Sequence, residues 1–138
     1  MKTYITQHKP QFRTIKNSNG TITTECLIVA QLNIEKLQRK YPFINVKQLL
    51  NRLTKKHIVS VNRGYAICSP EDQFNETIGR CLAKSRAKSE MYLYYLEIFS
   101  KMKKILEECY HSFKIINDKI IVCTANEITH SHSSKLCE

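Results

Sequence analysis

One stretch decides the fold of this chain, and it runs Ala66-Ile-Cys-Ser-Pro-Glu-Asp-Gln-Phe-Asn-Glu-Thr-Ile-Gly-Arg-Cys-Leu-Ala-Lys-Ser-Arg-Ala87. It predicts the end of a strand, a corner at Ser-Pro-Glu-Asp, and the opening turns of a long cationic helix. Ser69 can cap a helix, and Pro70 suits a first helical position. Asn75 offers a second helix start a few residues later. The stretch therefore predicts a strand that leads directly into the longest helix of the chain.

A row of basic residues follows on this predicted helix. Arg80, Lys84 and Lys88 stand four residues apart and so share one face, and Arg86 lies nearby. Like charges at this spacing repel each other and destabilise a helix slightly. Because a docked acidic partner relieves that repulsion, we expect these four residues to contact something anionic. The alternative is a solvated helical face with a structural cap.

The overall charge points the same way. The chain has 138 residues, with 22 Lys and Arg against 12 Asp and Glu, a formal net charge of +10. Such a balance favours a nucleic acid, a nucleotide or an acidic protein face as partner. The chain contains neither an apolar run of about 18 residues nor a secretory signal, so we expect a cytoplasmic protein without a membrane partner. Its six cysteines are then expected to be reduced.

Upstream of the corner, the pattern predicts two hairpins and two short helices. The first hairpin consists of residues 11–16 and 21–32, joined by the turn Asn17-Ser-Asn-Gly20. Asn33 and Asn45 are each expected to cap a short helix. The second hairpin is expected over residues 57–68, with its turn at Gly64.

Downstream, the long helix is expected from about residue 76 to about residue 111. Its apolar residues form a heptad-like seam, which is compatible with a domain core or with a homodimer. Residues 113–123 predict a last hairpin, and residues 124–138 predict a mobile tail. The sum is one compact α+β domain over residues 1–123, with short β-hairpins, two short helices and one long helix.

The segment from Leu49 to Ile67 resembles the recognition helix and wing of winged-helix domains. A β-hairpin stands where the first helix of that motif should be. The resemblance implies a nucleic-acid-binding regulator, the alternative function. Under it, bases would be contacted by Lys47, Asn51 and Arg52, and phosphates by Lys55, Lys56 and Arg63.

The pattern Cys-Ser-Pro-Glu-Asp-x-Phe-Asn-x-x-x-Gly-Arg-x-x-Ala-x-x-x-Ala over residues 68–87 resembles a short motif in small phage and prophage proteins of Gram-positive hosts. Some of these proteins are counter-defence factors that block bacterial immunity. The resemblance implies an anti-CRISPR-like inhibitor that binds a host defence protein stoichiometrically, such as a Cas nuclease or its nucleoprotein complex. It is also compatible with a protein that sequesters a nucleotide signal. In either case Arg80, Lys84, Arg86 and Lys88 would contact the anion.

Catalysis is the less favoured interpretation. Cys68 precedes a predicted helix start, which can lower the pKa of a thiol, but no histidine has a motif-level reason to lie beside it. Glu71, Asp72 and Glu76 are explained by helix capping. We therefore expect no enzyme, no cofactor and no metal site. Tyr92 and Tyr95 fall among the apolar stripes of the helix and are expected in the core, whereas Tyr94 points away from both stripes and is a candidate interface anchor.

Overall fold

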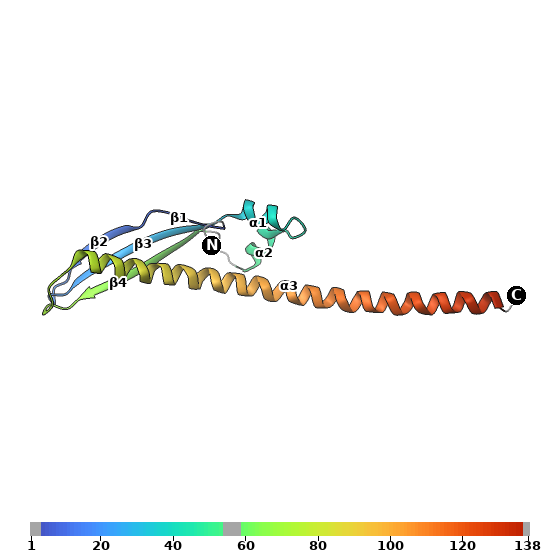
Figure 1. Cartoon of the computed structure of the whole chain (residues 1–138). Coiled ribbons are helices and arrows are strands. Elements are labelled where there is room, and N and C mark those ends of the chain that lie inside the picture. Colours follow the sequence, from blue (N-terminus) through green and yellow to red (C-terminus); the bar gives the residue numbers. More distant parts are fainter. Residues whose placement is uncertain (1–3, 54–58, 137–138) are drawn as a thin grey trace. The chain divides into compact units, whose positions relative to one another are not determined.

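The computed structural model describes residues 4–53 and 59–136. It is an α+β structure, as predicted, with the elements β1 (Ile5–Gln7), β2 (Gln11–Lys16), β3 (Ile22–Leu32), α1 (Ile34–Lys40), α2 (Val46–Leu53), β4 (Val59–Cys68) and α3 (Glu76–Leu136) (Figure 1). Contacts divide the chain into an N-terminal unit, Met1–Ser100, and a C-terminal unit, Lys101–Glu138. Helix α3 contributes residues to both units.

Strand β3 is the centre of an antiparallel sheet. It pairs with β4 over the whole length of that strand, from Gln31 opposite Val59 to Ile22 opposite Cys68. Strands β1 and β2 also pair with β3, β1 near its end and β2 near its start. A strand has two hydrogen-bonding edges. Because β4 occupies one edge of β3, β1 and β2 both pair along the other edge. Pro10, which lacks an N–H group, lies in the break between β1 and β2.

The first predicted hairpin and both predicted helix caps are confirmed. Gly20 has a φ of 85° in the turn between β2 and β3, a conformation that favours glycine. The side chain of Asn33 accepts a hydrogen bond of 3.1 Å from the N–H of Lys36 at the start of α1. Asn45 caps α2 in the same way through the N–H of Gln48.

The second predicted hairpin is wrong, because residues 59–68 form one continuous strand. Side chains along β4 alternate between a buried face and an exposed face without interruption at Gly64. This alternation is typical of a strand covered on one side only. Gly64 is therefore not a turn residue, and its lack of a side chain serves another purpose.

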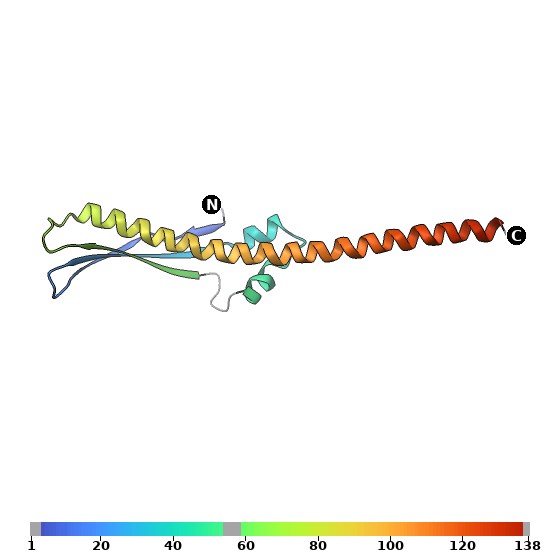
Figure 2. The ribbon, with the colours of Figure 1, turned by 90° about the horizontal axis from the view of Figure 1, so that it is seen from below.

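Gly64 allows α3 to approach the sheet closely. A Cβ atom at this position would overlap the backbone oxygen of Ala83 and the backbone nitrogen of Ala87. Neither of these obstacles can move as a flexible side chain can. The N-terminal part of α3 thus lies against the buried face of the sheet with backbone nearly on backbone, and Figure 2 shows it running along the sheet.

The helix face that packs on the sheet changes in size along its length. Five residues spaced four apart lie on this face, and their side chains grow in size toward the C-terminus: Gly79, Ala83, Ala87, Met91 and Tyr95. The last four of these are fully or almost fully buried. Small residues suit the close approach at Gly64, and the larger ones fill the wider space further along.

A buried hydrogen-bond chain joins the helix to the sheet at this wider end. Asn62 donates to the carbonyl of Ile28 at 3.2 Å and to the hydroxyl of Ser60 at 3.0 Å. Ser60 in turn donates to the hydroxyl of Tyr95 at 3.1 Å. Burial raises the pKa of Tyr95, although the bond from Ser60 acts in the opposite direction. The core is thereby tied together by partnered polar groups, which are costly to disrupt.

The third predicted hairpin, over residues 113–123, is also wrong. Helix α3 starts at Glu76, as predicted, but it continues without a break to Leu136, so that residues 124–136 are helical as well. The run of β-branched residues around Ile115 and Ile121 suggested strands. Such residues lower helix propensity only slightly, and their recurrence at three- and four-residue spacing equally suits a helix.

The contact at Gly64 generates a first prediction. Replacing Gly64→Ala should lower the free energy of unfolding by about 3 kcal/mol, because a methyl group would push α3 off the sheet. The measurement is urea unfolding followed by circular dichroism. The control is Val61→Ala on the exposed face of the same strand, expected to cost less than about 1 kcal/mol. Equal effects of the two changes would contradict the close contact.

Candidate anion-binding surface

The positive charge of the chain is concentrated in the N-terminal unit. This unit contains 16 of the 22 Lys and Arg residues but only 7 of the 12 Asp and Glu residues. It therefore carries nine of the ten net positive charges. Any anion would therefore be attracted more strongly to this unit than to the C-terminal one.

The four basic residues predicted to form one row lie on two flanks of α3. The guanidinium group of Arg80 lies over the ring of Phe12 in β2, with 5.2 Å to the ring centroid. Arg86 instead reaches β4, where it donates a hydrogen bond to the carbonyl of Tyr65. Because β2 and β4 lie on opposite sides of β3, Arg86 is separated from the other cations.

Arg80 has an acidic partner within the chain. Its guanidinium group lies 2.8 Å from a carboxylate oxygen of Glu76, one helical turn earlier. Both side chains are about half exposed, so the pair contributes little to stability. The pair nevertheless offsets the charge of Arg80, which weakens its attraction for an external anion.

Arg86 protects the open edge of the sheet. Strand β4 has backbone groups that point away from β3, and two of them are bound by side chains of α3. Arg86 binds the carbonyl of Tyr65, and Glu90 accepts a hydrogen bond of 3.0 Å from the N–H of Arg63. Blocking an edge in this way prevents another strand from adding to the sheet. Arg86 therefore has a structural role that sequence analysis did not identify.

Lys84 and Lys88 differ from Arg80 and Arg86 in their surroundings. Both side chains are half-buried beside the sheet, and neither has an acidic partner among the residues that the structure describes. Burial raises the pKa of the nearby Cys26 thiol, and the positive charges of the two lysines oppose that rise. These two lysines, named here the lysine pair, are the part of the predicted row that stays available to an anion.

The residues of the predicted nucleic-acid contact are only partly brought together. Lys47, Asn51 and Arg52 lie exposed on α2, whereas Lys55 and Lys56 fall outside the described residues. Arg63 belongs to a strand instead of a wing. Its side chain lies on the exposed sheet face, 3.8 Å from one carboxylate oxygen of Glu25. The other carboxylate oxygen of Glu25 accepts a hydrogen bond of 2.8 Å from Arg13.

The exposed face of the sheet forms a surface that was not predicted from the sequence. Val59, Val61, Tyr65 and Ile67 are all large and exposed on this side of β4. The signal was the strict alternation of residues 59–67, which the expected turn at Gly64 concealed. The face combines these apolar side chains with charged groups around Glu25 and polar residues such as Gln31, so it differs in character from the flank that carries the lysine pair.

The corner before α3 encloses a small cavity. Its lining includes Thr24, Cys68 and Gly79, and its volume is about 210 Å³. This is below the roughly 300–1,000 Å³ typical of small-molecule sites. The Thr24 hydroxyl is buried there and has no partner among the described atoms. The Cys68 sulfur lies 3.5 Å from the carbonyl oxygen of Ser69, and among the described residues no group of three side chains is arranged to hold a metal ion.

Of the two tyrosines of α3 that were expected in the core, Tyr92 and Tyr95, only Tyr95 is buried. Tyr92 is 44% exposed and not part of the core. Tyr94 is half-buried, and its ring meets that of Tyr95 edge to face, with 5.2 Å between centroids. Tyr92 lines an apolar groove of about 740 Å³ together with Tyr4, Ile5, Ser89, Leu93, Tyr95, Leu96 and Phe99.

The edge-protecting role of Arg86 can be tested through stability. Arg86→Ala should lower the free energy of unfolding by about 1 kcal/mol, because the carbonyl of Tyr65 loses a charged donor. Arg52→Ala, which removes an exposed arginine from α2, should change it by less than about 0.5 kcal/mol. Both values come from urea titrations under the same buffer. If Arg86→Ala were as neutral as the control, the edge contact would have no structural importance.

Comparison with known proteins identifies no similar family, protein or structure: no family model matches the chain, and no curated protein or solved structure matches it either. Among the described residues, no helix is both long enough and apolar enough to cross a membrane.

Proposed function

We propose that this protein is a non-enzymatic binding protein whose basic N-terminal unit docks on an acidic surface of another protein. The observation that carries the proposal is the lysine pair. Lys84 and Lys88 lie one turn apart on α3, in a unit with nine net positive charges, and neither has an acidic partner among the described residues. Two unpaired like charges at this spacing favour association with an anion.

The surroundings of the pair favour a protein partner. Both lysines are half-buried beside the sheet, which leaves their side chains less freedom than a fully exposed lysine has. A fixed pair of cations suits a partner with carboxylates at matching positions. The sequestration of a nucleotide signal has less support, because the cavity near Cys68 is small and the larger groove beside Tyr92 is lined mainly by apolar side chains without a basic residue.

The resemblance over residues 68–87 gives the proposal a biological setting. It makes the partner a component of bacterial immunity, with a Cas effector as the most specific candidate and stoichiometric inhibition as the mode of action. A basic protein does not imitate a nucleic acid, so it would dock on an acidic catalytic or interdomain face of such an effector.

Nucleic acid is the second candidate partner, favoured by the exposed polar and basic residues of α2. Lys47, Asn51 and Arg52 are all accessible on one short helix. Contacts of this kind with phosphates would give binding that weakens steeply with salt.

Charge reversal at the lysine pair tests the proposal. A variant with Lys84→Glu and Lys88→Glu should lose at least about 90% of a partner that co-purifies with the wild type from a bacterial lysate at low salt, because like charges now oppose each other. The matched control carries Lys104→Glu and Lys114→Glu, which make the same change of charge on exposed positions of the C-terminal unit. The control should retain the partner.

Nuclease treatment of the lysate separates the two candidate partners. Retention of a protein after treatment supports the proposal. Loss of all bound material after treatment, together with loss in a variant carrying Lys47→Glu and Arg52→Glu, would support nucleic-acid binding instead. Equal retention by the wild type and the lysine-pair variant would contradict the role of the lysine pair.

A further inference from the structure

The C-terminal unit exposes an unusual amount of apolar surface. The described residues of this unit form one helix, and its side chains from residue 106 to residue 132 are almost all exposed. The large apolar ones are Leu106, Tyr110, Phe113, Ile115, Ile116, Ile120, Ile121, Val122 and Ile128. Helices on their own are marginally stable in water, and most gain stability by packing an apolar face. A helix of this composition therefore requires a partner surface.

The spacing of the apolar residues identifies what kind of partner fits. Leu106, Phe113 and Ile120 recur every seven residues, and Cys109, Ile116 and Cys123 recur three residues after each of them. These are the a and d positions of three successive heptads. We name these six residues the helical seam. The following positions of the repeat, Glu127 and His130, are polar and end it. A heptad seam of this length is typical of a coiled coil.

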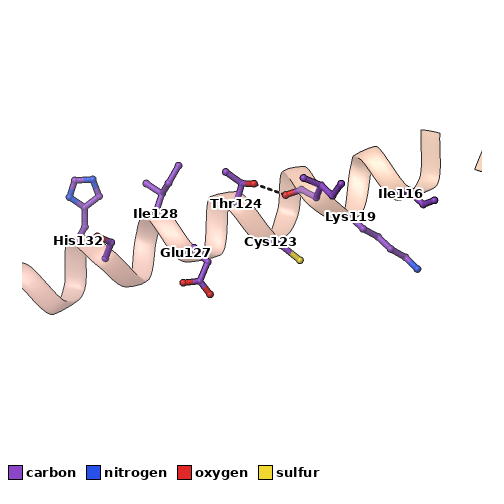
Figure 3. A pocket seen from close by; sticks show the side chains of 9 residues that line it. Ile116, Lys119, Cys123, Thr124, Glu127, Ile128 and His132 are labelled. Carbon is purple, nitrogen blue, oxygen red and sulfur yellow. Dashed lines mark hydrogen bonds between the residues drawn. The ribbon is translucent and has the colours of Figure 1, made fainter. Parts of the chain in front are cut away.

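The same register continues into the N-terminal unit, where the chain itself provides cover. Tyr92 and Phe99 occupy a positions, and Tyr95 occupies a d position. All three line the groove to which Ile5, the first residue of β1, and the preceding Tyr4 contribute. Residues in this register thus make apolar contacts where another part of the chain packs against them. Among the described residues, no other part of the chain packs in a comparable way against the six residues of the helical seam. Figure 3 shows labelled side chains of this part, including Ile116 and Cys123, projecting from a single helix.

We propose that the helical seam binds the same seam of a second copy of this chain, in an antiparallel coiled coil. Reversal of one helix places an a residue opposite a d residue in every layer. The layers are then Leu106 with Cys123, Cys109 with Ile120, and Phe113 with Ile116. Each thiol meets a large aliphatic side chain, so the layers differ less in volume than they would in a parallel pairing. A parallel pairing would instead place Phe113 on Phe113 and Cys109 on Cys109, and so would alternate crowded and poorly filled layers.

Area and charge agree with this arrangement. Burying a large apolar side chain removes on the order of 60–120 Å² from water, so twelve seam residues from two helices bury on the order of 1,000 Å². This is about the minimum area expected of a specific protein interface. The nine net positive charges of each chain precede Lys101 in the sequence. In an antiparallel pairing, the first residues of the two seams lie at opposite ends of the coiled coil. The positive charges that precede each seam are thereby kept apart, and their mutual repulsion is reduced.

Two neighbouring isoleucines give a matched test. Ile120 lies in the helical seam and Ile121 lies beside it, yet both are 58% exposed on the same helix. Sedimentation equilibrium of the wild type should show a dimer. Ile120→Lys should weaken dimerisation by at least about 100-fold, because a charge in the seam would be buried without a partner. Ile121→Lys should change it by less than about 3-fold. A monomeric wild type, or equal effects of the two substitutions, would overturn the proposal.

Cross-linking tests the direction of the two helices. Under mild oxidation, a variant with Ile120→Cys should form an interchain disulfide between Cys109 and the introduced thiol, identified by peptide mass spectrometry. The same substitution at Ile121 should not form one. A dominant link between the two copies of Cys109 in the wild type would overturn the antiparallel arrangement. Because these measurements use the purified protein alone, their outcome is independent of any partner of the lysine pair.

Discussion

The close contact between Gly64 of β4 and the backbone of α3 at Ala83 and Ala87 determines the arrangement of the N-terminal unit. It fixes the height of the helix above the sheet and its rotation about its own axis. Once the small residues face the sheet, the larger Tyr95 must enter the core further along, where it meets the hydroxyl of Ser60. The same rotation brings Arg86 and Glu90 to the open edge of β4, where they bind backbone groups.

This contact also explains how the basic residues are distributed. The stretch from Cys68 to Ala87 contains Gly79, Ala83 and Ala87, and these three small residues pack α3 against the sheet. The cations between them are forced onto the two flanks of the helix. One flank holds Arg86 in a structural role, and the other holds the lysine pair with its charges unpaired by described acids. The structural role of Arg86 is thereby separated from the binding role that we propose for the lysine pair, although these residues are close together in the sequence.

Sequence patterns predicted much of the fold because local signals act there without competition. Asn33 and Asn45 cap helices, and Gly20 takes the positive φ of a turn, through contacts with near neighbours only. Gly64 was misassigned because its lack of a side chain serves a contact with residues about twenty positions later. The helix beyond Phe113 was missed because β-branched residues favour strands only when a neighbouring strand is present. Arg86 was assigned to binding since its backbone partner at Tyr65 has no signature in the sequence.

The most direct measurement of the central contact is a nuclear Overhauser experiment on the isotopically labelled protein in solution. The account predicts strong cross-peaks between the α protons of Gly64 and the backbone and methyl protons of Ala83 and Ala87, since only a helix packed backbone against backbone brings them within reach. Absence of these cross-peaks, in a protein whose β3–β4 pairing is intact by the same experiment, would contradict the account.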